Sequence, residues 1–283
     1  MVVKSVMPLT PNPYFDPNEP ADDDLIWRYL SLQPVPKFQD MMANDEFYFC
    51  RPDKFGDKAE GIPSEKATAK LLGLNPLALD DRQTINNHRG FAAQVRENYF
   101  IMCWTLKKET VRMWGEYAPH GVAIRSRYGK LKKVFHDMLD KANLGKVMYG
   151  KDNPQRPGNL LCEISSKSED FQWEGEVRGF IECPAFLSGG NLHIDKDNFA
   201  RDRVLDENPR YPWIHDHKRR RVDLKELIEG MIISPWATPE LAREIREDWV
   251  KLKGHTYEVK DSELKSALLP PHEEYLKKKY LYE

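Results

Sequence analysis

The chain alternates between short apolar stretches and polar connections, and the apolar stretches follow two different periods. Seven segments rich in β-branched, aromatic or sulfur-containing side chains predict strands, because such side chains fit a pleated, half-buried surface. They span residues 46–51, 99–106, 121–127, 146–150, 173–183, 230–234 and 256–259. Seven strands predict at least one sheet.

Helical patterns lie between these strands. Residues 65–72 follow Ser64, which is a good N-cap, and residues 131–138 keep apolar side chains at helical spacing. Thr238, Pro239 and Glu240 provide an N-cap, a first-turn proline and an acidic first turn for a third helix. The apolar stripe of this helix consists of Leu241, Ile245, Trp249 and Leu252.

These elements predict an α+β fold, because strands and helices do not alternate regularly. The chain contains neither GxGxxG nor GxxxxGK[ST], which disfavours a Rossmann or P-loop nucleotide site. Residues 1–24 carry a cluster of prolines and acidic residues and predict an extended lead-in. Residues 25–283 are expected to form one domain, with a long irregular insertion at about 184–221 that is a candidate functional loop.

Composition narrows the functional classes. The formal net charge of −2 and a pI near 6.5 exclude a globally basic nucleic-acid binder. We find no apolar run near the ~20 residues of a membrane helix and no signal-like N-terminus, so a soluble, cytoplasmic protein without a membrane partner is expected. The four cysteines lack zinc-type spacing and are expected to be reduced.

The most informative segment is Trp173-Glu174-Gly175-Glu176-Val177-Arg178. If this segment is a strand, its period of two places Glu174, Glu176 and Arg178 on one face. Neighbouring carboxylates repel each other, so one is partly protonated or held by a cation, and such pairing is common at acid/base and cation-stabilising sites. An amphipathic strand with one face in water explains the same pattern.

Other candidate residues lie near aromatic side chains or at strand ends. Arg28 stands beside Tyr29, where a guanidinium can hold a phosphate or carboxylate while a ring offers a stacking face. Tyr48 and Arg51 end one predicted strand. Thr105 ends another, and Thr110, Trp114 and Tyr117 would share one face of the helix that follows. Together these residues suggest an aromatic-lined cleft, although surface positions, ordinary turns and core packing explain them too.

The run from His215 to Arg221 contains two histidines and four consecutive cations. No third ligand is identifiable, so no metal site is predicted. The four cations are expected to form a solvated loop, or alternatively to grip phosphates of a substrate, a cofactor or a nucleic acid.

An ordered set of motifs carries a resemblance to a known family. The motifs are Arg28-Tyr29, Arg51-Pro52 with Phe55 and Asp57, Cys103-Trp104-Thr105, Met113-Trp114-Gly115-Glu116-Tyr117 with Gly121-Val122-Ala123-Ile124, and Trp173-Glu174-Gly175-Glu176-Val177-Arg178. This set resembles a widespread family of bacterial and prophage-borne domains of unknown function and covers about residues 26–235. Such domains are in turn similar to ADP-ribosyltransferases, whose arginine, serine and glutamate class has an arginine, a hydroxyl and an ExE motif on successive strands.

The resemblance implies a mostly antiparallel, split sheet with flanking helices and an NAD site. Arg28 would hold the phosphates or adenylate ribose of NAD, and Thr105 would support the nicotinamide ribose. Glu176 would bind the 2′-hydroxyl of that ribose, while Glu174 would orient or deprotonate the acceptor. The chain departs from the pattern at Thr105, where arginine-directed members have a Ser-Thr-Ser run.

The residues fit this chemistry by themselves as well. Cleavage of the nicotinamide glycosidic bond develops an oxocarbenium-like cation that a carboxylate can stabilise, and Tyr29, Tyr48 and Trp114 could contact the ring while Arg51 and Arg178 add positive charge. We therefore expect an NAD-dependent ADP-ribosyltransferase, either a toxin or a phage-defence effector.

The acceptor would be RNA, DNA or protein, and residues 276–283 could contact a neutralising, antitoxin-like protein. The alternatives are an NAD glycohydrolase and a non-catalytic module that binds nucleotides or peptides.

Overall fold

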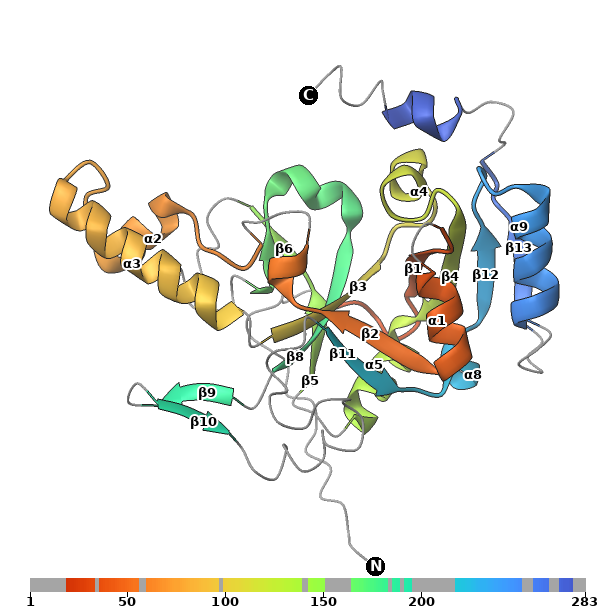
Figure 1. Cartoon of the computed structure of the whole chain (residues 1–283), viewed down its shortest axis with the longest axis horizontal. Coiled ribbons are helices and arrows are strands. Elements are labelled where there is room, and N and C mark those ends of the chain that lie inside the picture. The colour runs from red at the N-terminus through yellow and green to blue at the C-terminus, as the bar shows by residue number, and fades with distance from the viewer. Residues whose placement is uncertain are drawn as a thin grey trace, which may run out of the picture. The chain divides into compact units, whose positions relative to one another are not determined.

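The structure is a computed structural model that describes residues 19–33, 36–55, 60–96, 99–138, 142–150, 164–182, 185–188, 191–194, 217–250, 257–264 and 270–276. It is α+β, with a mixed, mostly antiparallel sheet and flanking helices, as the sequence predicts (Figure 1). The chain divides into two compact units. The first unit contains residues 1–20, 48–103 and 135–220, and the second contains residues 21–47, 104–134 and 221–283.

The strands of the first unit surround β8 (Glu176–Glu182). β8 pairs with β3 (Tyr99–Thr105) and runs antiparallel to β5 (Ala142–Lys146), from Ala142 opposite Ile181 to Lys146 opposite Val177. β2 (Glu46–Cys50) pairs antiparallel with β3 and lies next to β11 (His217–Arg221). β9 (Ala185–Ser188) and β10 (Asn191–Ile194) form an antiparallel hairpin, and β6 (Met148–Tyr149) and β7 (Ser166–Lys167) form a short parallel pair.

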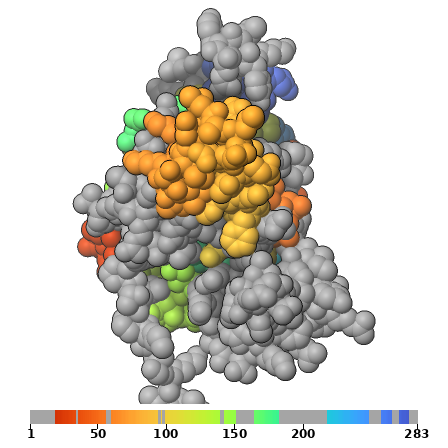
Figure 2. Space-filling model, turned by 90° about the vertical axis from the view of Figure 1, so that its left-hand side faces the viewer, coloured from red at the N-terminus to blue at the C-terminus, as the bar shows by residue number. Residues whose placement is uncertain are grey.

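The described part of the first unit contains two short 3₁₀ helices and two α-helices. The 3₁₀ helix η1 (Pro52–Lys54) follows β2, and η3 (Glu169–Glu174) precedes β8. α2 (Glu65–Leu72) is capped by Ser64, whose hydroxyl accepts a hydrogen bond from the Ala67 amide. α2 packs on α3 (Leu79–Val95), and Figure 2 shows the pair in orange and yellow as one continuous surface. Exposed apolar side chains on this surface are Leu71, Leu72, Leu77, Leu79 and Phe91.

The second unit is ordered around β1 (Leu25–Ser31) and β4 (Gly121–Arg127). The two strands are antiparallel, from Leu25 opposite Arg127 to Ser31 opposite Gly121. β4 pairs antiparallel with β12 (Gly230–Ile233), and β12 pairs in parallel with β13 (Glu258–Asp261). Trp27 of β1 pairs with Thr105 at the end of β3.

Helices described in the second unit include α1 (Lys37–Asn44), α4 (Val111–Tyr117), α5 (Tyr128–Asp137), α8 (Leu224–Leu227), α9 (Pro239–Glu244) and a π-helical turn, η5 (Ile245–Val250). α5 crosses into the first unit at Phe135. As predicted, Thr238 caps α9, because its hydroxyl accepts from the Leu241 amide. Leu241 and Ile245 of the predicted stripe are buried, whereas the side chain of Trp249 and the whole of Leu252 lie outside the described residues.

Each unit has its own aromatic core. In the first unit, Phe49 and Phe135 pack edge to face at 5.9 Å, and Gly179 leaves the space that Phe135 occupies. A Cβ on Gly179 would lie 2.1 Å from Cζ of Phe135, so the strand that carries Glu176 and Arg178 requires glycine there. In the second unit, Trp27, Trp114, Ala118, Ala123 and Ile232 form the central cluster.

Three sequence predictions need correction. The strand predicted over residues 173–183 begins only at Glu176. The segment 146–150 belongs to two separate strands, β5 and β6. The predicted irregular insertion at 184–221 contains the β9–β10 hairpin and β11, and its cationic end is a strand instead of a solvated loop, because its side chains alternate between buried and exposed positions.

Candidate functional site

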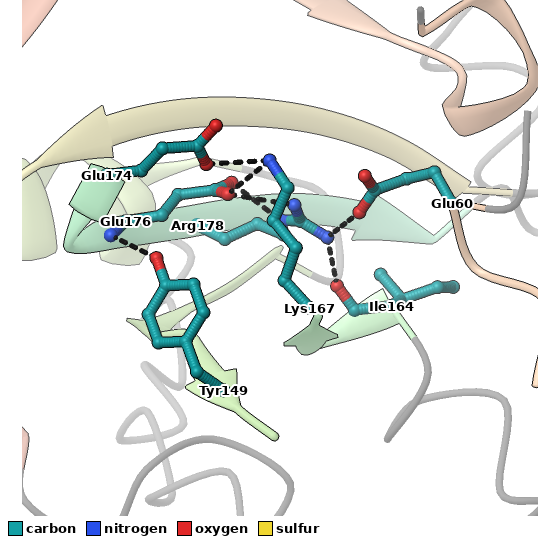
Figure 3. A network of polar contacts seen from close by, with 7 residues as sticks. All are labelled: Glu60, Tyr149, Ile164, Lys167, Glu174, Glu176 and Arg178. Carbon is teal, nitrogen blue, oxygen red and sulfur yellow. Dashed lines mark hydrogen bonds and ion pairs between the residues drawn. The ribbon is translucent and has the colours of Figure 1, made fainter. Parts of the chain in front are cut away.

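A buried network of charged side chains surrounds the start of β8 (Figure 3). The preceding 3₁₀ helix ends at Glu174, and Gly175 then adopts a left-handed conformation with φ of 52° before the strand begins at Glu176. Glycine reaches this region without a steric penalty. The two carboxylates are therefore brought together by a turn and not by the pleat of one strand, which corrects the predicted geometry.

Arg178 is the centre of the network. Its side chain is 0% exposed. Nε and Nη2 donate to Oε1 and Oε2 of Glu176 at 2.7 and 3.0 Å, which is the bidentate geometry of strong charge-assisted pairs. Nη1 donates to Oε1 of Glu60 at 2.7 Å and to the carbonyl oxygen of Ile164 at 2.6 Å. Arg178 thus joins β8 to two segments distant in sequence.

Lys167 of β7 bridges the two glutamates of the ExE motif. Its ammonium group donates to Oε2 of Glu174 at 2.6 Å and lies 3.5 Å from Oε2 of Glu176. The same nitrogen lies 4.6 Å from the centre of the Phe171 ring, within the range of a cation–π contact. On the other side of the strand start, the backbone amide of Glu176 donates to the hydroxyl of Tyr149 at 2.7 Å.

Opposite charges within the network keep Glu176 and Lys167 in their charged forms. Burial by itself raises the pKa of Glu176, but the charges of Arg178 and Lys167 outweigh it and lower that pKa to about 2. Burial opposes the charge of Lys167, and Glu176 and Glu174 outweigh this effect, so the pKa of Lys167 is raised. Burial, followed by the charge of Glu176, raises the pKa of Tyr149. Glu176 is therefore a carboxylate, not a carboxylic acid, at neutral pH.

Cys103 marks the place where solvent reaches the network. It is the exposed position of β3, whose other described side chains are buried. Its thiol donates a hydrogen bond to the carboxylate of Glu176, and burial together with the charge of Glu176 raises the pKa of the thiol. Cys50, the other cysteine among the described residues, is also reduced.

The other predicted residues of the first unit have local partners. Tyr48 stacks on the imidazole of His217 at 4.9 Å, and the Arg219 guanidinium lies 5.9 Å from the same ring. Arg51 forms a bidentate pair with Asp53 in η1, with both N–O distances 2.8 Å, and this pair lowers the pKa of Asp53. Arg51 therefore closes the turn after β2 in this state.

The remaining predicted residues belong to the second unit. Arg28 lies with its guanidinium carbon 5.5 Å from the centre of the Phe47 ring. Tyr29 packs edge to face on Trp114, with ring centres 4.8 Å apart. Trp114 is 0% exposed and donates its indole N–H to Glu109 at 3.1 Å, so it is a core residue. Thr105 is also buried, and its hydroxyl accepts a hydrogen bond from the amide of Lys107.

Thr110 does not share a helix face with Trp114 and Tyr117, contrary to the prediction. It is the N-cap of α4, and its hydroxyl accepts from the Met113 amide at 3.0 Å. Tyr117 is exposed, whereas Trp114 is buried, so the two rings have different surroundings.

Sequence patterns missed four members of the network. Glu60, Tyr149 and Lys167 lie far from the ExE motif in the chain or outside any recognisable motif, and Cys103 was identified only as part of the Cys103-Trp104-Thr105 motif. A signal was available for Lys167, because two ionised carboxylates in one place require cations and Arg178 alone balances one of them.

The four consecutive cations, residues 218–221, do not form a solvated loop that could grip a nucleic acid, because they lie in strand β11. Lys218 and Arg220 of β11 are 1% and 6% exposed, and the Lys218 ammonium lies 5.5 Å from the Phe100 ring centre. Arg221 is exposed. The two histidines separate as well, because His217 stacks on Tyr48 while His215 lies outside the described residues. Alternation along the strand thus divides the four cations between interior and surface.

Comparison with known proteins adds no relative: no family model, curated protein or solved structure matches the chain. The resemblance to ADP-ribosyltransferases therefore stays a prediction. Within the described ranges, we find no group of three or more side chains arranged to hold a metal ion. Within the same ranges, no helix has the length and apolar character needed to cross a membrane.

Proposed function

We propose that this protein is an NAD-dependent ADP-ribosyltransferase in which Glu176 is the catalytic carboxylate. One observation carries the proposal: Glu176 is buried, ionised and hydrogen-bonded to a thiol that solvent reaches. A carboxylate fixed in its charged form is suited to stabilising positive charge in a transition state. Because its pKa is about 2, Glu176 does not exchange protons near neutral pH, so its role is electrostatic.

The proposed reaction breaks the bond between C1′ of the ribose and the nicotinamide nitrogen. Nicotinamide leaves with the bonding electron pair, and C1′ develops oxocarbenium character that the Glu176 carboxylate stabilises. The acceptor then forms a bond to C1′ through a lone pair and loses its proton. The products are ADP-ribosylated acceptor, nicotinamide and one proton. Glu174 is proposed to orient or deprotonate the acceptor, with Lys167 controlling its position.

Arg178 and Lys167 are positioning residues in this proposal. The sequence suggested that Arg178 binds the cofactor, but its guanidinium is fully buried and bound to Glu176, Glu60 and Ile164. It fixes the orientation and charge of Glu176 instead. The Cys103 thiol occupies one acceptor direction of the carboxylate, and a ribose hydroxyl of NAD is proposed to take its place.

For the second unit by itself, the NAD contacts expected from the sequence stay separate proposals. Arg28 would hold the phosphates of NAD, Thr105 would support the nicotinamide ribose, and Tyr29 and Trp114 would contact the ring. The burial of Trp114 requires that this part of the second unit opens before it can touch a ligand.

The direct test is incubation of purified protein with labelled NAD and total cell extract. We compare the wild type with Glu176→Gln and with Glu169→Gln, which removes an exposed carboxylate from η3 just before the site. Label should reach a macromolecule with the wild type and Glu169→Gln, and fall at least about 100-fold with Glu176→Gln. Circular dichroism and thermal unfolding verify that each variant is folded. Equal labelling by all three proteins would refute the role of Glu176.

Product analysis separates transfer from hydrolysis. Free ADP-ribose without labelled macromolecule would identify an NAD glycohydrolase, in which water replaces the acceptor. Nuclease or protease treatment of a labelled product would identify RNA, DNA or protein as the acceptor. A biological role as a toxin or phage-defence effector predicts that expression of the wild type, but not of Glu176→Gln, arrests growth.

A second candidate function is a non-catalytic binding module. The specific observation in its favour is that both oxygens of Glu176 already accept hydrogen bonds from Arg178 and that Lys167 binds Glu174. Such pairing is sufficient to explain the charged residues as structural. A folded protein that binds NAD or another nucleotide but releases no nicotinamide would support this candidate.

A further inference from the structure

The C-terminal part of the second unit lies on α4. We define the C-terminal latch as residues 262–264 and 270–276. Its first segment follows β13 and is anchored on Glu109, which precedes α4. Ser262 donates its hydroxyl proton to Oε2 of Glu109 at 2.5 Å, and the Glu263 amide donates to Oε1 at 2.8 Å. Oε2 of the same carboxylate accepts the indole N–H of Trp114, so one side chain links the latch to the aromatic core.

The second segment fits a notch in α4 that a glycine creates. A Cβ on Gly115 would lie 2.3 Å from Cε1 of Tyr275, so only glycine leaves room for this ring. Nε2 of His272 lies 3.1 Å from the carbonyl oxygen of Gly115. The rings of His272 and Tyr275 stack with 18° between their planes and 6.2 Å between their centres.

Trp236, which follows β12, contacts the second segment of the latch. Its indole N–H donates to the carbonyl oxygen of Pro270 at 2.9 Å, and its ring lies 5.4 Å from His272 and 5.8 Å from Tyr275. Trp236 and Leu264 also pack against the cluster that contains Trp114. The latch therefore helps to enclose Trp114.

The two aromatic residues that the sequence predicts to bind a ligand lie beside the latch. Trp114 is closed to solvent, and the hydroxyl of Tyr29 lacks a polar partner among the described residues. Trp114 is 0% exposed. The hydroxyl of Tyr29 is buried and has no hydrogen-bond partner among the described residues, and burial, followed by the charge of Glu109, raises its pKa. A buried hydroxyl without a partner is unfavourable, so another state that satisfies it would be stabilised by that bond.

We propose that the C-terminal latch is an autoinhibitory device that keeps α4 and its Trp114 packed against Tyr29, and that its release opens this surface to NAD. The inference rests on the proposed function, because Tyr29 and Trp114 are the residues that would contact nicotinamide. α4 has seven residues, and a helix this short depends on tertiary contacts for its stability. Loss of the latch contacts should therefore free α4 to move.

The test weakens the contact between the latch and α4 with two kinds of variant, one in the latch and one in α4. The double variant His272→Ala/Tyr275→Ala removes the side chains that contact Gly115. The variant Gly115→Ala leaves the latch residues unchanged but fills their notch, and it improves the intrinsic helix propensity of α4. Glu273→Ala is the matched control, because Glu273 is an exposed residue of the same helical turn. Hydrogen exchange of the peptide spanning α4 is measured without NAD, and nicotinamide release is measured with NAD.

Both release variants should exchange the amides of α4 about tenfold faster and cleave NAD about tenfold faster than the wild type, and Glu273→Ala should do neither. Unchanged exchange in α4 in either release variant would overturn the latch. Faster exchange without faster NAD cleavage, in a protein whose wild type cleaves NAD, would overturn its inhibitory role. Absence of cleavage in every protein, with exchange accelerated as expected, would refute the proposed function and with it the inhibitory role of the latch, and would leave its contacts with α4 as purely structural.

Discussion

Each of the two units contains candidate residues that the sequence singles out, and the two units bury chemically different side chains. In the first unit, Glu176 and Arg178 are enclosed as ions, each with a partner of opposite charge. In the second unit, Trp114 is enclosed by apolar packing and Tyr29 packs against it partly buried, so that Trp114 is the most completely buried aromatic of the described cluster. The first pair keeps its chemistry in spite of burial, because Arg178 and Lys167 hold the Glu176 carboxylate ionised, whereas burial blocks the use of Trp114 in the second unit.

The difference also predicts how the two regions respond to perturbation. A buried ion pair is strongly destabilised when one partner is removed, because the other charge stays in a medium that solvates it poorly. An aromatic cluster loses stability in proportion to the apolar contact removed, with little dependence on pH or salt. Variants in each region, compared at several pH values, separate these two behaviours.

The largest effect is expected for Arg178→Met, which keeps an unbranched side chain but leaves Glu176 and Glu60 without their shared cation. Stability should fall by about 3–5 kcal/mol in urea unfolding. Arg246→Met is the control, because Arg246 pairs with Asp261 at a largely exposed site and should change stability by less than about 1 kcal/mol. Similar losses in both variants would show that the β8 network has no special role in stability.

The pH dependence should come next in size. The pKa of Glu176 is about 2 in the folded protein and near 4.5 when unperturbed, so the unfolded chain binds this proton more tightly. The stabilisation is complete above pH 4.5 and is lost as the pH falls toward 2. It amounts to about 3 kcal/mol. The raised pKa of Lys167 acts at the other end, since its contribution is complete below 10.5 and is lost only at higher pH.

This prediction is tested by urea unfolding of the wild type and Glu176→Gln at pH 6 and at pH 2.5. The stability difference between the two proteins should shrink at the lower pH, because the carboxylate is protonated in the unfolded wild-type chain at pH 2.5 and folding has to release that proton. Asp53 also has a lowered pKa, but it titrates in both proteins and cancels in the comparison. A difference that stays constant between the two pH values would contradict the assigned protonation state.

Sequence patterns predicted those elements correctly that depend on residues close together in the sequence. Strand β4 has the predicted bounds, and the helices after Ser64 and Thr238 begin at their predicted caps. These features rest on alternation and capping, which are local. α3 escaped prediction, because among the side chains described in it Ile85 and Ala92 are the buried ones, which leaves little apolar period to detect.

The candidate site shows the opposite case. The residues of the ExE motif were identified correctly, but their geometry depends on the left-handed turn at Gly175, which a period of two does not reveal. Their partners Glu60 and Lys167 are brought in by tertiary packing. Lys218 was expected in solvent because it is charged, whereas the strand places it over the Phe100 ring. Long-range contacts decide the last two outcomes, whereas the first depends on a local glycine conformation.

A smaller effect is expected for Trp114→Phe in the aromatic region. The substitution removes part of a fully buried ring and the hydrogen bond to Glu109, and stability should fall by about 1–3 kcal/mol. The loss of stability should stay the same when the salt concentration is raised from roughly 0.05 to 1 M, a range over which the screening of charges changes strongly. Phe91→Leu, at an exposed aromatic of α3, is the control and should be nearly neutral. A loss that varies strongly with salt would mean that the Glu109 charge, and not packing, dominates.

The smallest effect on stability is expected for Tyr29→Phe, and it separates structure from function most directly. The Tyr29 hydroxyl is buried without a hydrogen-bond partner among the described residues, so its removal should leave stability unchanged or raise it by up to about 1 kcal/mol. If the hydroxyl contacts NAD when the latch opens, the same variant should bind NAD about fivefold more weakly. Thermal unfolding and calorimetric titration measure the two quantities. A destabilised variant would show that the hydroxyl already has a partner, whereas an unaltered affinity for NAD would assign Tyr29 to the core with Trp114.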